Sequence, residues 1–126
     1  MPLTQISMRR GKSPAYRKGV LNAVQLALRE TFDAPPRDFF MTISEHDEEN
    51  FVYSPDYLDM ARSDELLIIQ LVVSQTRGLK QKQALYRRIV ELLGQSPGLR
   101  PDDVFINVVE VARENWSFGH GLAQYA

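Results

Sequence analysis

The stretch MPLTQISMRRGKSP, residues 1–14, holds a strand, an Arg-Gly turn and a helix start, a layout that recurs later in the chain. Leu3 to Ser7 is typical of a short strand. Ser13 followed by Pro14 is typical of a helix N-cap with proline at the first helical position. The stretch therefore predicts a strand that is closely followed by a helix.

The rest of the first half continues this pattern. Apolar residues at helical spacing predict a helix that residues 33–36 end, and they are Val20, Leu21, Val24, Ala27, Leu28 and Phe32. A second strand is predicted over residues 39–44, opened by Asp38 and ended by the polar run 46–50. Residues 51–53 are predicted as a further short strand, before an irregular segment that reaches about residue 64.

The second half begins again with a buried strand from Glu65 to Val73. Its apolar stretch, Leu66 to Val73, is interrupted by Gln70 and needs cover on both faces. After a turn at residues 75–78, a helix is predicted with Leu85, Ile89, Leu92 and Leu93 on one face. Gly94 is its expected stop. A loop over residues 97–102 leads to a last strand over residues 104–111.

The two halves share their landmarks in the same order. Arg10-Gly11 and Arg77-Gly78 lie 67 positions apart, while Asp38 and Glu45 lie 65 positions before Asp103 and Glu110. Chance similarity is the alternative to an internal repeat. A repeat predicts an α+β fold: two β-α-β units in one mixed sheet, with both helices on one face. We expect a single domain over residues 1–126, with halves at about 2–54 and 65–111 and a tail at 112–126.

This arrangement predicts where three polar groups meet. The two parallel strands of the first unit begin at one end of the sheet, so Pro2 and Asp38 should lie together. A pseudo-twofold axis would reverse the second unit, so that the strand ending at Val73 carries Arg77 to the same edge. An amine, a carboxylate and a guanidinium together suit a site for a small acid.

Composition excludes several classes of function. With a formal net charge of -1 and dispersed basic residues, the 126-residue chain has no basic surface for nucleic acid. No cysteine is present, which excludes disulfides and thiolate catalysis and favours the cytoplasm. The longest apolar stretch, residues 66–73, is too short to span a bilayer, and the first residues lack the apolar run of a secretory signal.

Motifs for metals and cofactors are not found in the sequence. His46 and His120 are isolated and have no HExxH spacing, so we expect no metal. The sequence contains neither a nucleophile elbow nor a phosphate-binding glycine loop, and we expect no cofactor. The partners we expect are a small oxo-acid substrate and further copies of the chain, without nucleic acid or membrane.

Proline at position 2 offers unusual chemistry. If Met1 is removed, Pro2 becomes a terminal secondary amine, which can accept a proton or polarise a carbonyl. An attached Met1 would turn this nitrogen into an amide, which is not a base. Many chains begin with Met-Pro without any catalytic role, so the hypothesis depends on what surrounds Pro2.

Motifs across nearly the whole chain resemble the tautomerase superfamily, and within it the malonate semialdehyde decarboxylase group. They are Pro2, Asp38 to Phe40, Thr42 to His46, Ser74 to Arg77, Pro101 to Val104, and WSFGHGLAQY from Trp116 to Tyr125. The resemblance implies two β-α-β units assembled as a homotrimer, with active sites near the subunit boundaries.

The same resemblance implies roles for individual residues. Pro2 corresponds to the catalytic amine, Asp38 to its acidic partner, and Arg77 to the second of two arginines in the family turn. Gln75 occupies the place of the first arginine and can donate a hydrogen bond but no charge. Trp116 and Phe118 correspond to aromatic residues that line the pocket. Without the resemblance, Asp38 would be read as a turn residue and the two aromatics as core or interface.

The expected function is a cofactor-independent enzyme that acts on small oxo-acids, similar to malonate semialdehyde decarboxylase and hydratase. One alternative is a keto-enol tautomerase of the phenylpyruvate or 2-hydroxymuconate type. Another is a catalytically weak, homo-oligomeric binding protein, since Gln75 replaces a charged residue. Because Asp38 remains while one arginine is absent, Pro2 is expected to be predominantly cationic at neutral pH, which favours decarboxylase chemistry.

Overall fold

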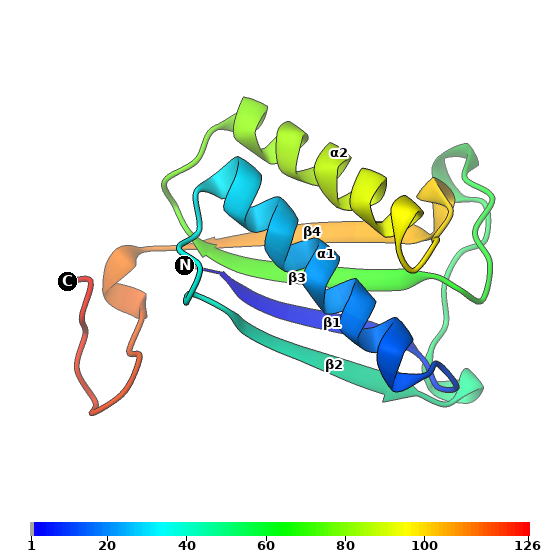
Figure 1. Cartoon of the computed structure of the whole chain (residues 1–126), viewed down its shortest axis with the longest axis horizontal. Coiled ribbons are helices and arrows are strands. Elements are labelled where there is room, and N and C mark those ends of the chain that lie inside the picture. Colours follow the sequence, from blue (N-terminus) through cyan, green and yellow to red (C-terminus); the bar gives the residue numbers. More distant parts are fainter. Residues whose placement is uncertain (1) are drawn as a thin grey trace.

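Two strand-helix-strand units form one four-stranded sheet with both helices on the same face (Figure 1). The computed structural model describes residues 2–126. The main elements are β1 (Leu3–Arg9), α1 (Pro14–Phe32), β2 (Phe40–His46), β3 (Leu67–Ser74), α2 (Leu79–Gln95) and β4 (Val104–Val111). Four short 3-10 turns lie between or after them, at Glu48–Asn50, Tyr57–Asp59, Pro101–Asp103 and Arg113–Asn115.

The strand order β2-β1-β3-β4 gives the mixed sheet that the sequence predicts. β1 and β2 run parallel, β3 and β4 run parallel, and β1 lies antiparallel to β3 at the centre. In both parallel pairs the partners lie 37 positions apart: Leu3 faces Phe40, and Leu67 faces Val104. The α+β fold and the reversal of the second unit are confirmed.

A repeated ion pair ties each helix to its own strand. Arg17 of α1 lies 3.5 Å from Glu45 of β2, and Lys82 of α2 lies 2.8 Å from Glu110 of β4. Both members of the second pair follow those of the first by 65 positions. All four side chains are partly buried, so each pair fixes the approach of a helix more firmly than a solvated surface pair would.

Helix α1 begins and ends through local chemistry. The Ser13 hydroxyl accepts a hydrogen bond from the backbone N–H of Tyr16 at 3.1 Å, and Pro14 occupies the first helical turn, as predicted. Asp33 ends the helix in the left-handed conformation, with φ of 55°. The chain then turns through Pro35 and Pro36 and enters β2.

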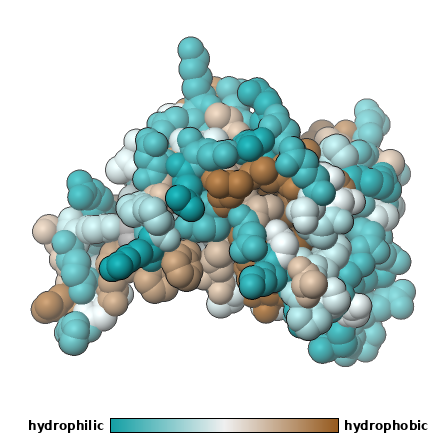
Figure 2. Space-filling view, viewed as in Figure 1, coloured by the Kyte–Doolittle hydropathy of each residue, from teal (hydrophilic) through white to brown (hydrophobic). Residues whose placement is uncertain are grey.

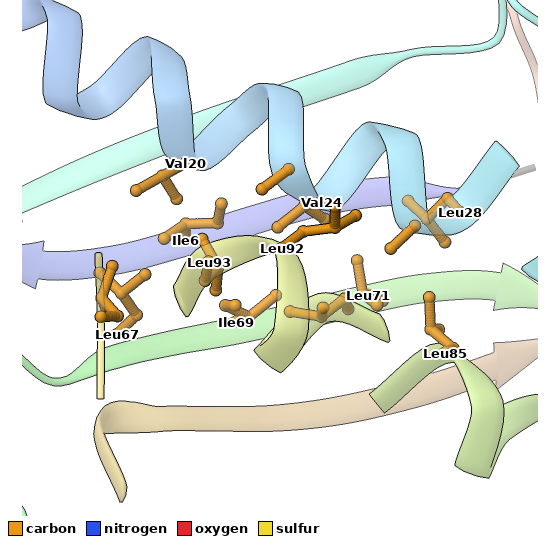
Figure 3. Close-up of a cluster of buried hydrophobic side chains, with 14 of the residues drawn as sticks. Ile6, Val20, Val24, Leu28, Leu67, Ile69, Leu71, Leu85, Leu92 and Leu93 are labelled. Atoms are coloured by element: carbon orange, nitrogen blue, oxygen red, sulfur yellow. The ribbon is translucent and has the colours of Figure 1, made fainter. Parts of the chain in front are cut away.

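The core lies between the helices and one face of the sheet (Figure 3). Alternate residues of β3 point toward the helices and are fully buried, among them Leu67, Ile69 and Leu71. Val24 and Leu28 of α1 meet them. Each such side chain contributes roughly 1.5–3 kcal/mol through its removal from water. Every second residue of β3 and the residues of α1 that recur with a period of about 3.6 therefore pack together in one apolar layer.

The opposite face of the sheet has no helix over it. Phe40 and Phe105 are about half exposed there, at 51% and 49%, and Val109 is 38% exposed. Gln70 donates a hydrogen bond to Asn107 across this face at 3.0 Å. On the helical side, seen in Figure 2, hydrophilic side chains surround an apolar furrow between α1 and α2. The two faces of the sheet thus differ sharply in cover.

Two local predictions are wrong. Residues 51–53 form no strand, because side-chain contacts hold them in place of a ladder: the Phe51 carbonyl accepts from Arg9 at 3.4 Å, and the Tyr53 hydroxyl donates to Asp64 at 2.7 Å. Gly94 does not stop α2, which continues to Gln95. Beyond the end of α2, Gly98 has a positive φ of 106°, and its N–H donates to the Leu93 carbonyl at 2.9 Å.

Neither helix of the described chain combines the length and the apolar character needed to cross a bilayer.

Candidate active site

The candidate site lies at the edge of the sheet where β1 begins. Leu3 pairs with Phe40 on one side and with Val72 on the other, so the start of β1 lies beside the start of β2 and the end of β3. This register brings Pro2, Asp38 and Arg77 to one edge, and Pro2 is buried there. Met1 lies outside the described residues, so its removal stays a prediction.

Asp38 is a buried carboxylic acid, only 6% exposed. Its backbone is fixed on both sides: the N–H donates to the Pro35 carbonyl at 3.0 Å, and the carbonyl accepts from the Gln25 side chain at 3.4 Å. Burial raises the pKa of the Asp38 carboxyl above its ordinary value, and the positive charge of Arg77 opposes part of this rise. Asp38 is therefore a stronger base than a solvated aspartate.

Arg77 follows β3 and is held in place by the chain around it. Its guanidinium donates to the Thr76 hydroxyl at 3.0 Å and to the Phe32 carbonyl at 2.5 Å. The guanidinium carbon lies 4.9 Å from the centre of the Phe32 ring, a cation–π distance. Among residues 2–126, no carboxylate forms an ion pair with Arg77. The result is an oriented cation whose charge stays available.

The C-terminal tail places an aromatic cluster at the same edge. The Trp116 indole N–H donates to the Ser74 hydroxyl at 3.0 Å, and its ring stacks on Phe118 at 5.5 Å and 10°. Phe118 also meets Tyr125 edge-on at 5.0 Å and Phe40 at 6.3 Å. In Figure 1 the tail extends past the end of the sheet on the side of the N-terminus.

A small hollow of about 290 Å³ opens between the tail and the turn after β3. Its lining consists of Pro35, Ser74, Thr76, Arg77, Arg113 and Tyr125. Burial raises the pKa of the Tyr125 hydroxyl, as does the nearby negative charge of Asp38, while Arg113 acts in the opposite direction. Tyr125 thus lies within electrostatic reach of both Asp38 and Arg113, which connects the hollow to the buried acid.

The structure separates the six residues that the sequence singled out. Pro2, Asp38 and Arg77 share the edge, and Trp116 and Phe118 stand beside it. Gln75 is exposed, its backbone N–H donates to the Val111 carbonyl at 2.9 Å, and it does not belong to the described lining of the hollow.

Sequence reasoning missed Arg113 and Tyr125. Tyr125 closes the tail motif, which could have indicated a role for it. Arg113 follows the last predicted strand by two residues, so only the pairing of β4 with β3 reveals where it lies.

Other hollows in the described chain lack this combination of groups. A larger one, of about 520 Å³, lies at the far end of the sheet among charged residues. Its cations are paired: Arg10 with Asp47 at 2.9 Å, Arg9 with Asp64 at 2.8 Å, and Lys12 with Glu65. Within residues 2–126, His, Asp and Glu side chains form no group of three that could hold a metal ion.

Chemically, the edge at β1 can combine three functions. A terminal amine at Pro2 would donate or accept a proton or form an iminium, and a buried carboxylate would set its charge or activate water. The oriented guanidinium of Arg77 would hold the carboxylate of a substrate.

Comparison with known proteins places the chain among enzymes of related structure. The family model described as "Tautomerase enzyme" matches residues 38–119. The probable tautomerase YusQ of Bacillus subtilis is 36% identical over 124 residues, covering 98% of each chain. A second protein of that bacterium, the probable tautomerase YrdN, is 30% identical over 125 residues, covering 99% of this chain and 96% of its own.

Solved structures extend the comparison. A malonate semialdehyde decarboxylase, analysed for its decarboxylase and hydratase activities, superimposes with a TM-score of 0.91 at 30% identity, covering 98% of this chain and 95% of its own. The FG41 malonate semialdehyde decarboxylase inhibited by 3-bromopropiolate also gives 0.91, at 33% identity, with 98% and 93% covered. A fused 4-OT symmetric trimer gives 0.80 at 17% identity, a likeness of fold alone, with 98% and 97% covered.

Proposed function

The chain belongs to the tautomerase family, and we propose that it is a cofactor-independent enzyme that uses the amine of Pro2 on small oxo-acids. Decarboxylation of malonate semialdehyde is the main reaction that we propose, with hydration as a related one. The observation that carries this proposal is the meeting of Pro2, the buried Asp38 and the oriented Arg77 at one sheet edge. The similarity to two malonate semialdehyde decarboxylases supports it.

In the decarboxylation, Arg77 holds the substrate carboxylate while the aldehyde carbonyl faces Pro2. Cationic Pro2 polarises the carbonyl by donating a hydrogen bond to its oxygen, or Pro2 first gives a proton to water and the neutral amine condenses with the carbonyl to an iminium with loss of water. The bond between C1 and C2 then breaks and its electron pair forms a C2–C3 double bond, while the π pair of the carbonyl or iminium moves to its oxygen or nitrogen and carbon dioxide leaves. C2 gains a proton, and hydrolysis of any iminium returns the amine and releases acetaldehyde.

Asp38 has two proposed tasks in this chemistry. Its negative charge favours the cationic form of Pro2, because an opposite charge nearby stabilises a protonated amine. In the hydration reaction the same carboxylate would accept a proton from the attacking water. Burial raises its pKa toward the working pH, which makes it a more effective general base than an exposed aspartate.

A keto-enol tautomerase is the second candidate, and the two Bacillus subtilis relatives named as probable tautomerases favour it. Here neutral Pro2 would take the α-proton and return it, with Arg77 again holding the carboxylate. A third candidate is an oligomeric protein that binds oxo-acids with weak turnover, which the exposed, uncharged Gln75 favours.

We also propose that the enzyme is a homotrimer located in the cytoplasm. The uncovered face of the sheet, with Phe40, Phe105 and Val109 exposed, supports association with further copies. The projecting tail supports it as well, because Leu122 is 60% exposed. Sedimentation of the processed protein should give a trimer at micromolar concentration, and a stable monomer would contradict this assembly.

The function is tested by incubating processed protein with malonate semialdehyde and, separately, with phenylenolpyruvate. Intact mass first checks that Met1 is absent, since an amide nitrogen at Pro2 would end the mechanism. We expect rapid release of acetaldehyde and slow ketonisation, both lost in Pro2→Ala. Efficient ketonisation with a Pro2 pKa well below 7 would identify a tautomerase. If the protein accelerates neither reaction, the binding-protein alternative is supported.

A further inference from the structure

Arg113 lies beside the turn that carries Arg77, although 36 positions separate the two residues in the sequence. The pairing of β3 with β4 explains this, because Ser74 at the end of β3 pairs with Val111 at the end of β4. The Gln75 N–H continues the ladder by donating to the Val111 carbonyl at 2.9 Å. From there, β4 leads directly into the 3-10 turn Arg113–Asn115.

The Arg113 side chain lines the 290 Å³ hollow together with Arg77 and Tyr125. Its guanidinium carbon lies 5.6 Å from the centre of the Tyr125 ring, so the tail orients it. Tyr125 is in turn packed edge-on against Phe118, which stacks on Trp116. A chain of ring contacts therefore connects Arg113 to the aromatic cluster beside the site.

Two features together distinguish Arg77 and Arg113: both line the hollow, and neither forms an ion pair within residues 2–126, an absence that they share with Arg29, Arg37, Arg62 and Arg87. Arg9, Arg10, Arg17, Arg88 and Arg100 each lie within 4.0 Å of a carboxylate. Among residues 2–126, no such ion pair is formed by Arg77 or by Arg113. Two positive charges with no carboxylate within 4.0 Å among residues 2–126 thus line one small hollow, and Asp38 acts on Arg77 only from a greater distance. This arrangement favours an anion as occupant.

We infer that Arg113 is a second substrate-binding cation, which holds the carboxylate of a short oxo-acid together with Arg77. This inference rests on the proposed function for the identity of the substrate. Arg77 is fixed by the backbone of α1, whereas Arg113 is held by the tail, so the carboxylate is bound between two separate parts of the chain. A hollow of 290 Å³ is at the small end of ligand pockets, which suits acids of a few carbon atoms.

The inference predicts a specific split in kinetics. In decarboxylation the carboxylate loses its negative charge as carbon dioxide forms, so the cations that hold it stabilise the bound substrate more than the transition state. Arg113→Gln should raise KM for malonate semialdehyde about tenfold or more without lowering kcat, the pattern of lost ground-state binding. Arg113→Lys should recover part of the affinity, since it keeps the charge but not the fork geometry.

Malonate, an unreactive acid, provides a test that does not depend on turnover. Calorimetry on the processed trimer should show malonate binding that weakens about tenfold or more in Arg113→Gln, the loss expected for one charge-assisted contact. Arg87→Gln is the matched control, because Arg87 is exposed on α2 and lies outside the described lining of the hollow. Sedimentation of each variant checks that the assembly is intact.

The outcomes separate this inference from the proposed function. If wild-type protein binds malonate through Arg113 but does not decarboxylate the semialdehyde, the function is wrong and the inference stands. If decarboxylation is efficient and Arg113→Gln leaves KM and malonate affinity unchanged, Arg113 is not a substrate-binding residue. Failure of wild-type protein to bind malonate would also overturn the inference.

Discussion

The two ends of the sheet have the same design but different chemistry. We call the edge with Pro2, Asp38 and Arg77 the proline end. The repeat places Leu67, Asp103 and Arg10 at the opposite edge, which we call the Asp103 end. Position 67 follows Pro2 by 65 residues, as position 103 follows Asp38, so each group at one end has an equivalent at the other.

The two aspartates show how the ends differ. Asp103 is fully buried, and Ser63 donates to it twice at 2.7 Å, through the backbone N–H and the hydroxyl, while Arg100 lies 3.9 Å away. These contacts use its charge to hold the loop before β3. At Asp38, burial raises the carboxyl pKa and Arg77 is the opposing charge. The same repeat position thus serves architecture at one end and is suited to chemistry at the other.

The two arginines differ in the same way. Arg10 is exposed and pairs with Asp47 at 2.9 Å, so its charge is neutralised within the chain. Arg77 packs on the Phe32 ring and has no carboxylate in an ion pair within residues 2–126. The comparison teaches that neutralisation by neighbours, more than position in the repeat, distinguishes a structural charge from one available to a ligand.

The largest effect on activity should come from the pair of equivalent repeat positions that differ most in chemistry, Pro2 and Leu67. Pro2→Ala should lower kcat/KM by about 10²- to 10⁴-fold, which is the usual contribution of a general acid or base. The free energy of unfolding should not change. Leu67→Ala should do the opposite: it should lower the free energy of unfolding by about 2–5 kcal/mol and spare kcat in folded protein. Steady-state kinetics measure kcat/KM of both variants, and denaturant titrations measure their free energies of unfolding. Pro2→Ala with half the wild-type activity would remove Pro2 from the mechanism.

The arginines are the next contrast. Arg77→Gln should cost about 2–3 kcal/mol in kcat/KM for an acidic substrate, mainly as a higher KM, because a charge-assisted contact is lost. Arg10→Gln breaks only an exposed ion pair and should change the free energy of unfolding by less than about 1 kcal/mol, with activity unaffected. Steady-state kinetics of the two variants side by side decide the point. Equal KM values would place Arg77 outside the site.

The aspartates should separate stability from activity. Asp103→Asn weakens charged hydrogen bonds from Ser63 in a fully buried place, so the free energy of unfolding should fall by about 2 kcal/mol. Asp38→Asn should reduce turnover without a comparable loss of stability. Urea titrations, interpreted with a constant m-value, provide the comparison. A larger destabilisation in Asp38→Asn would show that both carboxylates are structural.

The smallest effect concerns pH. Because burial raises the pKa of Asp38, the folded state binds this proton more readily than the unfolded state does. The ionised carboxylate therefore lowers stability once the pH passes the folded pKa, and this penalty disappears below the unfolded value. Asp38→Asn removes the penalty. As the pH rises above the ordinary aspartate pKa of about 3.9, the Tm of Asp38→Asn minus that of the wild type should increase. Scanning calorimetry measures this difference, and a difference that falls with pH would show the opposite pKa shift.

Much of the fold follows from sequence because its signals are local or repeated. Ser13-Pro14 marks the start of α1 through an N-cap, and the apolar period marks the buried face of each helix. The end of α2 was mispredicted, because nothing in the local sequence shows whether Gly94 or Gly98 adopts the left-handed conformation, and the structure gives it to Gly98. The strand prediction for residues 51–53 was wrong for a related reason. Their conformation is held by hydrogen bonds with Arg9 and Asp64, which are distant in sequence.

Only those candidate site residues that the repeat and its topology bring together could be predicted from the sequence. Parallel pairing brings Asp38 to Pro2, and the reversal of the second unit brings Arg77, so topology alone suffices for these three. Arg113 and Tyr125 depend on how the tail folds back after β4, which no periodicity describes. Gln75 was assigned to the site from its place in a motif, yet its side chain is exposed.

The connection between β2 and β3 has a consequence for stoichiometry. A polypeptide has one N-terminus, so position 67 is an interior residue with an amide nitrogen, and the terminal amine proposed at Pro2 serves only one of the two equivalent edges. If the terminal amine is the catalytic group, the repeated sheet can hold only one such site per chain. A circular permutant that begins with proline at position 67 would move the single terminal amine from position 2 to the other edge, next to Asp103.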